Sequence, residues 1–343
     1  MEYLVGSKEK FWKFVDSINE DDKVGIITHT DLDGIASAIF LEKILNSKGI
    51  QVDSIFFTGY KKDIFKNIIP KLNKITKVFL TDMYADGIDA QGFEKLKNNC
   101  ETFVIDHHPV VNKNAKNTIK TESSDCSAYA LFDLGEEIIN KEKWKMLLYA
   151  TMISEMSYKN PENMEFLKKD YPNLSEENIL SSSPGELAKT ISGALIYFSS
   201  LKRDLIEIYN LIKKQDFETI KKYNKEVQKE IDFHLKEIKE KAQYFPKKDL
   251  YLYYFNPNFN ITSVIGTIFS CEHKNSSIII LSDIDENKIK VSARNQNKKQ
   301  DMSALLKKGI QGLDDAVAGG HVPAAGGSFL KKDLNKFKEN ILL

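Results

Sequence analysis

The sequence predicts an α/β protein in which a doubly wound, mainly parallel N-terminal sheet is joined by long helices to a smaller C-terminal α/β unit. Three observations lead to this fold class. The chain of 343 residues is long for one compact core. Its first half alternates strand-like and helix-like segments, and a long amphipathic stretch then precedes a last unit of about 95 residues, an ordinary domain size. We expect domains at 1–190 and 246–343, with a helical linker over 191–245.

Apolar periodicity places the elements of the first half. The run KVGIITHT at 23–30 is short and apolar, as in a buried strand, and 34–49 carries apolar residues at helical spacing up to a terminal glycine. Further strands are expected at 52–57, at 77–83 and from 103, and helices around 62–72 and near 89–98.

From about 201 to 243 the apolar residues recur at three- and four-residue steps among lysines and glutamates, which predicts long amphipathic helices ending before Pro246. We expect these helices to pack on the body or to link the two lobes, and a homodimer interface is the alternative. The aromatic residues within 251–255 fit core packing, with base stacking as the alternative. Strands are expected at 249–255, 276–284 and 288–294, and a helix at 301–313.

Charge and cysteine content exclude several classes of protein. Forty-nine basic side chains balance forty-nine acidic ones, so no global field holds a long polyanion and any nucleic-acid contact must be local. No stretch approaches about 18 uninterrupted apolar residues, so we expect no membrane span. Cys100, Cys126 and Cys271 lack metal-type spacing and the first residues lack an apolar signal core, so we expect a cytoplasmic protein.

Acidic and histidine side chains follow the carboxyl ends of three predicted strands. Open α/β sheets bind ligands beyond those strand ends, so residues distant in sequence would converge there. Carboxylates with some imidazole suit Mn²⁺ or Mg²⁺ rather than thiolate-seeking metals. The residues are His29, Asp31 and Asp33 after the first strand, Asp82 after the third, and Asp106, His107 and His108 after the fourth.

The spacing of His29, Asp31 and Asp33 places all three on one face if the first strand continues through them. A carboxylate such as Asp82 can offer an oxygen to each of two ions, and two ions about 3.5–4 Å apart activate water and stabilise a phosphoryl oxygen. Taken singly, Asp33 could cap the next helix, Asp82 could be a loop acid and His107 a core histidine. Repetition at three strand ends favours a metal site for phosphate ester hydrolysis.

These motifs resemble those of the DHH phosphoesterase superfamily, whose name comes from the triplet found here at 106–108. THTDLDGIASA resembles its first motif, LTDM its second and VIDHHP its third, and SDCSAYALF resembles the helix start that follows. VSARNQ and AGGHVPAAGGSF resemble the DHH-associated domain. The resemblance covers most of the chain, and the order and spacing of the motifs are highly specific. It implies an active site in the cleft between the two domains.

The resemblance implies two divalent metal ions, Mn²⁺ first, with Mg²⁺ or Co²⁺ as alternatives. Asp82, His108 and Asp106 would form the catalytic group, with His108 toward the scissile phosphate and Asp106 orienting a neighbouring histidine. The fourth-motif acid would be Glu155, where the family has aspartate. The longer glutamate either shifts the second ion, binds through water or is an ordinary helix residue. His29, Asp31 and Asp82 would hold one ion, and Asp33, Asp82, His107 and Glu155 the other.

The second domain would grip the substrate. Gly319 and Gly320 would let the backbone approach a phosphate closely. His321 would donate to a phosphate oxygen, and Arg294 would offer a planar fork to the same anion.

The glycine-rich segment departs in one place from the family's commoner GGGH. Ala318 takes the position of the first glycine, which is costly only if φ is positive there. Gly326 and Gly327 would let the chain turn away after the two preceding alanines.

Within the superfamily the chain resembles NrnA-type, RecJ-related enzymes. We expect hydrolysis of short oligonucleotides or small nucleotides to mononucleotides: nanoRNA, linear or cyclic dinucleotides such as pApA or c-di-AMP, or 3′-phosphoadenosine 5′-phosphate. One alternative is a RecJ-like single-strand exonuclease, which usually has an extra oligonucleotide-binding domain and needs a basic groove. Another is a nucleotide-binding sensor without turnover. A pyrophosphatase would not need the glycine-rich phosphate grip.

Overall fold

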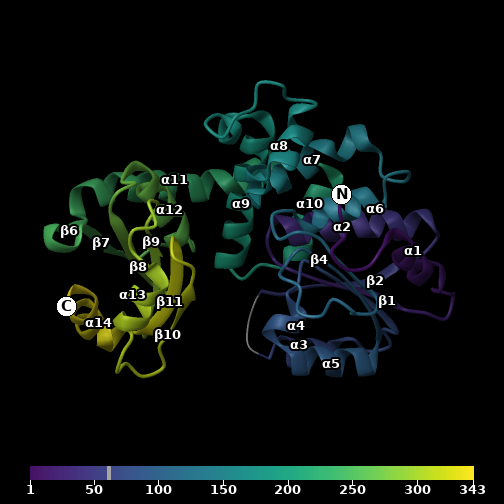
Figure 1. Cartoon of the computed structure of the whole chain (residues 1–343), viewed down its shortest axis with the longest axis horizontal. Helices are drawn as coiled ribbons and strands as arrows, with labels where there is room; N and C mark the ends of the chain where they lie inside the picture. Colours follow the sequence, from purple (N-terminus) through teal and green to yellow (C-terminus); the bar gives the residue numbers. More distant parts are fainter. Residues whose placement is uncertain (60–62) are drawn as a thin grey trace. The chain divides into compact units, whose positions relative to one another are not determined.

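The computed structural model describes residues 1–59 and 63–343. The chain folds into two compact units (Figure 1). The first comprises Met1–Leu195 and Asp204–Lys221, and the second comprises Ile196–Arg203 and Lys222–Leu343. The segment 191–245 is therefore divided between the units, and its role as a linker stays a prediction.

The N-terminal unit contains a five-stranded sheet of order β2-β1-β3-β4-β5. Every neighbouring pair in it is parallel, which confirms the doubly wound parallel sheet. Strands β1 and β3 are buried at every position, as expected when helices cover both faces. The strands are β1 (Val24–Thr28), β2 (Val52–Phe57), β3 (Lys77–Thr81), β4 (Glu101–Asp106) and β5 (Thr118–Lys120).

Helices lie on both sides of this sheet (Figure 1). On one face the rings of Phe11 and Phe14 in α1 contact Phe79 of β3. On the other face, Phe65 of α3 and Leu96 of α5 share a buried core with β3. The helices are α1 (Lys8–Asp16), α2 (Leu32–Ser47), α3 (Ile64–Ile68), α4 (Ala85–Ile88), α5 (Ala90–Asn99), α6 (Ser127–Leu134), α7 (Lys141–Ser154), α8 (Pro161–Lys168), α9 (Ser183–Ser200) and α10 (Leu205–Lys214).

The first strand ends earlier than expected, so one prediction is wrong. Strand β1 stops at Thr28 and α2 begins at Leu32, because the Asp31 carboxylate accepts a hydrogen bond from the Gly34 backbone N–H at 3.0 Å and caps the helix. His29, Asp31 and Asp33 therefore do not alternate along one strand. Gly34 permits this turn, since a Cβ there would lie 2.3 Å from the His29 carbonyl oxygen.

Two other element limits also differ from expectation. The range 62–72, expected to be one helix, starts at residue 62, which lies outside the described residues. From Ile64 onward the structure has the short helix α3, followed by a single 3-10 turn at Ile69–Lys71. The amphipathic pattern from 201 becomes helical only at Leu205, and Leu201 is exposed. Further 3-10 turns are Ser157–Lys159, Ile179–Ser181, Pro246–Lys248 and Lys331–Asp333.

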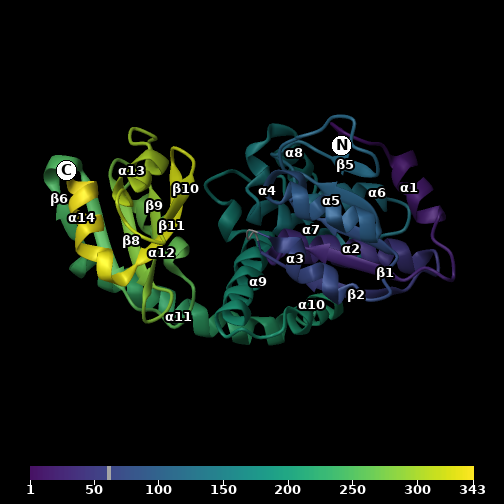
Figure 2. The same ribbon diagram turned by 90° about the horizontal axis from the view of Figure 1, so that it is seen from below.

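The C-terminal unit has a six-stranded sheet of order β10-β11-β9-β8-β7-β6. Strands β7 and β8 pair in parallel and the other neighbours pair antiparallel. Helices α11 and α12 cover one face, and α13 and α14 cover the other (Figure 2). The elements are α11 (Phe217–Lys241), β6 (Gln243–Phe245), β7 (Leu250–Phe255), α12 (Thr262–Glu272), β8 (Ser277–Asp283), β9 (Lys288–Arg294), α13 (Met302–Gly309), β10 (Val317–Gly320), β11 (Ala324–Leu330) and α14 (Leu334–Leu342).

The glycine-rich segment forms a β-hairpin, which the sequence reading missed. Gly326 and Gly327 do not turn the chain away, because they lie inside β11 and pair with β9 on one side and β10 on the other. A Cβ on Gly327 would lie 2.3 Å from the Val317 carbonyl oxygen, so close strand pairing accounts for that glycine. Ala318 has no positive φ, and its place in the motif is unstrained.

The aromatic residues of β7 mainly support the core. Tyr253 and Phe255 are buried among residues of α11 and α12, as the core-packing interpretation expected. In the part of the chain described, no helix has both the length and the apolar character needed to cross a membrane.

Candidate metal centre

The acids and histidines of the first three motifs meet beyond the carboxyl ends of β1, β3 and β4. In the sheet β1 lies beside β3. After β1 the chain continues to β2 on one side, and after β3 it continues to β4 on the other side. Open α/β sheets bind ligands in the crevice at the carboxyl ends of two such strands. Asp82 follows β3 in the left-handed conformation, with φ of 54°, which aspartate tolerates better than most residues. Its backbone N–H donates to the Ile105 carbonyl oxygen of β4 at 3.0 Å, which fixes the turn.

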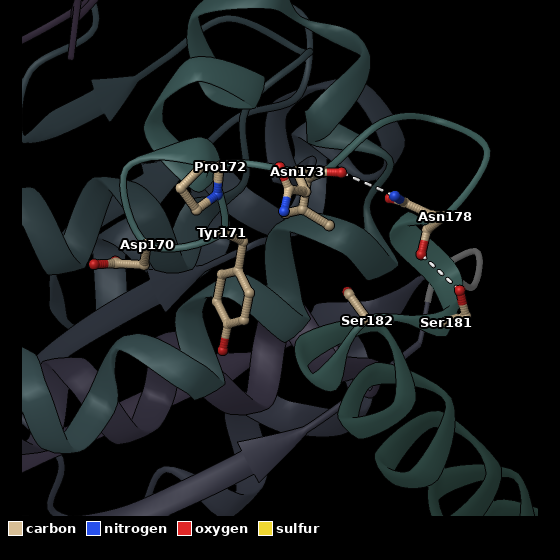
Figure 3. Close-up of a pocket in the computed structure, with 8 residues that line it drawn as sticks. Asp170, Tyr171, Pro172, Asn173, Asn178, Ser181 and Ser182 are labelled. Atoms are coloured by element: carbon tan, nitrogen blue, oxygen red, sulfur yellow. Dashed lines mark hydrogen bonds between the residues drawn. The ribbon is translucent and has the colours of Figure 1, made fainter.

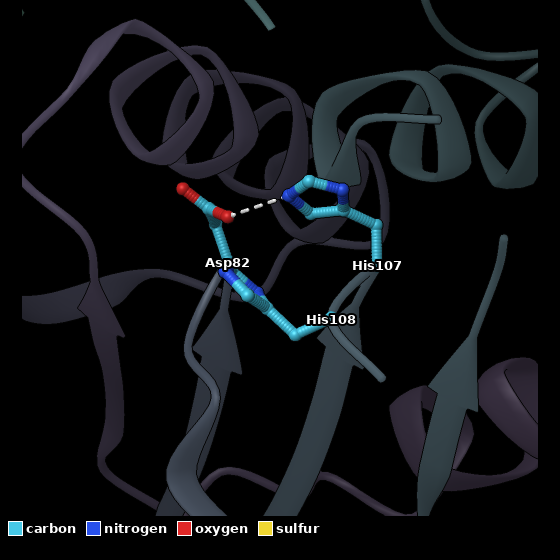
Figure 4. A group of neighbouring side chains, drawn as sticks. All are labelled: Asp82, His107 and His108. Atoms are coloured by element: carbon cyan, nitrogen blue, oxygen red, sulfur yellow. Dashed lines mark ion pairs between the residues drawn. The ribbon is translucent and has the colours of Figure 1, made fainter. Parts of the chain in front are cut away.

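Two groups of potential ligand atoms lie here, and Asp82 belongs to both. His29, Asp31 and Asp82 each place one such atom within 4.8 Å of the others. Asp82, His107 and His108 form the second group by the same measure. Figure 4 shows the latter three side chains converging, with the Nε2 of His107 at 3.3 Å from the Oδ1 of Asp82. Asp82 is thus a buried carboxylate that belongs to two groups, each of which also contains imidazole. Such a carboxylate can offer one oxygen to each of two cations.

Asp33 lies at the edge of the second group and has a second task. Both of its oxygens accept backbone hydrogen bonds at 2.8 Å, from Ser127 and Ala128 at the start of α6. Its Oδ2 also lies 3.8 Å from the Nε2 of His107. The alternative role of Asp33, capping the helix that follows it, is taken by Asp31, which caps α2. Asp33 instead accepts hydrogen bonds from the first N–H groups of α6.

Glu155 is the C-cap of α7 and lies outside both ligand groups found among the described residues. It is nevertheless near them, because its charge contributes to raising the pKa of Asp82. Burial, with the charges of Asp31 and Asp33, raises the pKa of Glu155 to about 9. Whether it binds an ion stays a prediction.

The site crowds buried carboxyl groups that repel one another when they are ionised. Burial, and then the neighbouring Asp33 and Asp31, raise the pKa of Asp82 well above its ordinary value, and burial also raises the pKa of Asp33. Burial acts in the same direction on Asp31 and is the largest single influence there. The hydrogen bond with His29, the charge of His29 and the hydrogen bond from the Gly34 N–H act against it, and together the opposing contacts lower the pKa of Asp31.

This set of donor atoms fits divalent cations. Carboxylate oxygens and imidazole nitrogens match Mn²⁺ and Mg²⁺, and a cation would relieve the repulsion among the carboxylates. The buried Nδ1 of His107 has no hydrogen-bond partner among the described residues, whereas its Nε2 faces Asp82 and Asp33. The Nε2 of His107 therefore points toward the two carboxylates and is the nitrogen that could bind a metal ion beside them.

His108 is held by groups that sequence reasoning only partly identified. Its Nδ1 lies 2.7 Å from the Oδ1 of Asp106, which is the contact that the predicted orienting role of Asp106 requires. Burial opposes ionisation of Asp106, but the hydrogen bond with His108 and the charge of Lys120 outweigh it and lower the pKa to about 2. Lys120 and Tyr84, whose ring stacks on His108, were missed. The sequence signal for them was weak: a lysine ending a short strand and a tyrosine after the second motif.

The predicted substrate-binding residues lie together in the C-terminal unit. Arg294 ends β9 directly opposite Ala324, beside the turn of the hairpin that carries Gly319, Gly320 and His321. Its guanidinium donates to the Ala293 carbonyl oxygen at 2.9 Å and to Thr267 at 3.3 Å. His321 is exposed at the hairpin turn. The structure thus places a cation beside a glycine-lined turn.

A separate cavity of about 420 Å³ lies in the segment between α8 and α9 (Figure 3). The rim contains a hydrogen bond from the side-chain amide Nδ2 of Asn178 to the backbone carbonyl oxygen of Asn173, at 2.9 Å. None of the predicted site residues, all of which are described, lines it. It is lined by Asp170, Tyr171, Pro172, Asn173, Leu174, Asn178, Ser181 and Ser182.

The fold and the site define an α/β protein with a carboxylate–histidine centre suited to divalent cations. Residues 23–154 match the DHH family N-terminal domain, and residues 257–342 match the DHHA1 domain. The chain belongs to the DHH superfamily, as its motifs indicated. Members of this superfamily are metal-dependent hydrolases.

Sequence similarity to a curated protein covers part of the chain. An uncharacterized protein of Methanocaldococcus jannaschii is 30% identical over 101 residues, which are 29% of this chain and 22% of that protein. The match therefore spans less than a quarter of that relative's length.

Solved structures share the fold over nearly the whole chain. Exonuclease RecJ bound to manganese has a TM-score of 0.69 at 14% identity, covering 99% of this chain and 95% of that one. RecJ with Mn²⁺ from Thermus thermophilus has a TM-score of 0.67 at 15% identity, covering 97% and 53%. An exopolyphosphatase-related protein from Bacteroides fragilis has a TM-score of 0.57 at 17% identity, covering 98% and 95%. At these identities the likeness establishes the fold class, which is as predicted.

Proposed function

We propose that the protein is a two-metal phosphoesterase that hydrolyses short oligonucleotides or small nucleotides to mononucleotides. The observation that carries this proposal is the position of Asp82, a buried carboxylate shared by the His29–Asp31 group and the His107–His108 group. Divalent cations held there, Mn²⁺ first, would activate a water molecule and stabilise negative charge on a phosphoryl oxygen. The neighbouring Asp33 and Glu155 would complete the second group of ligands.

The chain's own residues would bind and orient the substrate. His108, fixed through Nδ1 by Asp106, would contact an oxygen of the scissile phosphate. In the C-terminal unit the Arg294 fork and the exposed His321 would donate to a second anionic group of the substrate. Gly319 supports this role, because a Cβ there would meet nothing within 4 Å and a phosphate can reach its backbone.

A small substrate is favoured over a long strand. The formal net charge of zero gives the protein no global positive field to hold a long polyanion by counterion release. Activity should therefore fall steeply as the oligonucleotide lengthens. Linear and cyclic dinucleotides, nanoRNA and 3′-phosphoadenosine 5′-phosphate all lie in the favoured range.

The test is mononucleotide release from a 5′-phosphorylated dinucleotide in Mn²⁺, compared with oligonucleotides of increasing length. Wild-type protein should act fastest on the shortest substrates, and Asp82→Ala should abolish the activity. Equal or faster processive digestion of a long single strand would favour the alternative, a RecJ-like exonuclease, which the fold likeness to RecJ supports. Tight nucleotide binding with full metal occupancy and no product would instead support a sensor.

A further inference from the structure

Lys120 ends the short strand β5 inside the N-terminal unit, with 3% of its side chain exposed. Its Nζ lies 2.7 Å from the Oδ2 of Asp106 and 3.5 Å from the Oδ1 of Asp86. It also donates longer hydrogen bonds, at 3.4 Å, to the carbonyl oxygens of His108 and Pro109. A buried ammonium persists only where it is paired, and most of these partners belong to the DHH triplet or directly follow it.

The backbone of Lys120 is fixed on both sides. In β5 it pairs with Asp106 of β4, and the Thr121 N–H donates to the Asp106 carbonyl oxygen at 3.2 Å. On the other side the Lys120 N–H donates to the Val5 carbonyl oxygen at 3.1 Å and its own carbonyl accepts from Leu4 at 2.8 Å. The ammonium and the Asp106 carboxylate therefore extend from backbone that cannot readily shift.

Asp106 connects Lys120 to His108. The carboxylate is fully buried, and its two oxygens have different partners: Oδ1 lies 2.7 Å from the His108 Nδ1, and Oδ2 lies 2.7 Å from Lys120. With one oxygen held by the ammonium, the other can face the imidazole in only one direction. A carboxylate fixed at Nδ1 selects both the ring orientation and the tautomer of a histidine.

The Tyr84 ring holds the face of the same imidazole. The two rings stack at 5.6 Å between centroids with 14° between their planes, and the Lys120 Nζ lies 5.2 Å from the Tyr84 centroid. The tyrosine ring also lies over Gly87, where a Cβ would be 2.0 Å from the ring Cζ. Only glycine at this position leaves room for the ring.

We propose that Lys120 is a positioning residue that, through Asp106, sets the orientation and tautomer of His108, while Tyr84, seated on Gly87, holds the face of the ring. This inference rests on the proposed function. It adds Lys120, Tyr84 and Gly87 to the residues on which turnover depends, although none of them is assigned a contact with the substrate.

Lys120→Met in the full chain tests the proposal, with Lys77→Met as the matched control. Lys77 is likewise buried in the same sheet and ion-paired, with its Nζ 2.6 Å from Glu101. It lies at the amino end of β3, whereas the ligand groups lie beyond the carboxyl end. Both variants should lose thermal stability. Only Lys120→Met should lower kcat, by about 10- to 100-fold, with KM and the number of bound Mn²⁺ ions unchanged, and Lys120→Arg should recover part of the loss.

A second readout does not depend on turnover. The chain has six histidines, and His108→Gln identifies the ring signals of His108 in ¹⁵N spectra of the Mg²⁺-loaded protein. Wild type and Lys77→Met should show one His108 tautomer, protonated at Nδ1, whereas Lys120→Met should change it. If the wild type releases no mononucleotide, the proposed function fails, and these spectra still decide the present inference.

Gly87→Ala tests the stacking contact without removing a charge. Its Cβ should displace the half-buried Tyr84 ring and leave the buried core of the unit untouched, so the protein should stay folded with a lowered kcat. Wild-type kcat in Gly87→Ala would remove Tyr84 from the proposal. Wild-type His108 signals and kcat in Lys120→Met, or an equal loss of kcat in Lys77→Met, would overturn the role of Lys120.

Discussion

The Oδ1 of Asp82 lies 3.3 Å from the Nε2 of His107, and this pair joins the ends of β3 and β4 in the interior of the N-terminal unit. The other oxygen of Asp82 lies 3.7 Å from the Nδ1 of His29, at the end of β1. One carboxylate is thus the meeting point of three strand ends. This relationship underlies the proposed two-metal chemistry, and the predictions below separate it from purely structural roles.

Asp31→Asn separates helix capping from metal binding. Asparagine caps helices about as well as aspartate, so the metal-free protein should lose only the partly exposed ion pair with His29, about 1 kcal/mol or less. The amide is a weaker ligand, so the rise in Tm caused by Mn²⁺ should shrink. Thermal unfolding with and without MnCl₂ measures both effects.

Asp89→Asn is the control for this comparison. Asp89 caps α5 through the Gly92 N–H at 3.0 Å and belongs to neither ligand group. Its variant should keep the full Mn²⁺ response. If Asp31→Asn keeps it as well, Asp31 is only a cap.

The stability of the metal-free protein should depend on pH through Glu155. The folded protein keeps this carboxyl protonated up to about pH 9, whereas the unfolded chain loses the proton near the ordinary value of 4.5. The folded state therefore binds more protons between these values, and the free energy of unfolding should fall as pH rises through that window. Glu155→Gln should flatten this dependence.

Thermal unfolding of EDTA-treated protein across the same window measures the slope. Glu177→Gln, at an exposed position, serves as the control and should keep the wild-type slope. Parallel curves for the wild type and Glu155→Gln would contradict a buried, charge-crowded Glu155.

Adjacent glycines in the hairpin should respond differently to alanine. Gly320 has φ of 138°, and a Cβ there would lie 2.5 Å from the Ala324 carbonyl oxygen, so Gly320→Ala should destabilise the protein by about 1–3 kcal/mol. Gly319 has open space around it, so Gly319→Ala should fold normally. If the Gly319 backbone contacts a phosphate, its variant should still raise KM. Urea unfolding and steady-state kinetics separate the two effects, and a wild-type KM for Gly319→Ala would remove Gly319 from the binding site.

Much of the fold could be predicted because local patterns decide it. Buried strands such as β1 and β3 read as short apolar runs, and a parallel sheet brings their carboxyl ends to one edge whatever the detailed packing. The convergence of His29, Asp82 and His107 follows from that topology. The end of β1 could not be predicted, because it depends on whether Asp31 continues the strand or caps α2.

The supporting residues could not be identified from the sequence. Lys120 comes near Asp106 only because β5 pairs with β4. Tyr84, just before α4, contacts His108 only in the folded protein, where the two rings stack. The hairpin of β10 and β11 could not be recognised because its glycines suggest a loop, whereas β10 pairs with β11 and β11 pairs with β9. In each case a long-range contact, not local propensity, determines the outcome.

Anomalous diffraction from crystals of the Mn²⁺-loaded protein tests the central claim most directly. We predict two manganese peaks per chain, one beside His29 and Asp31 and one beside His107, with Asp82 contacting both, and the loss of both peaks in Asp82→Asn. Well-folded protein without manganese at this site, or with manganese that Asp82 does not contact, would contradict the account.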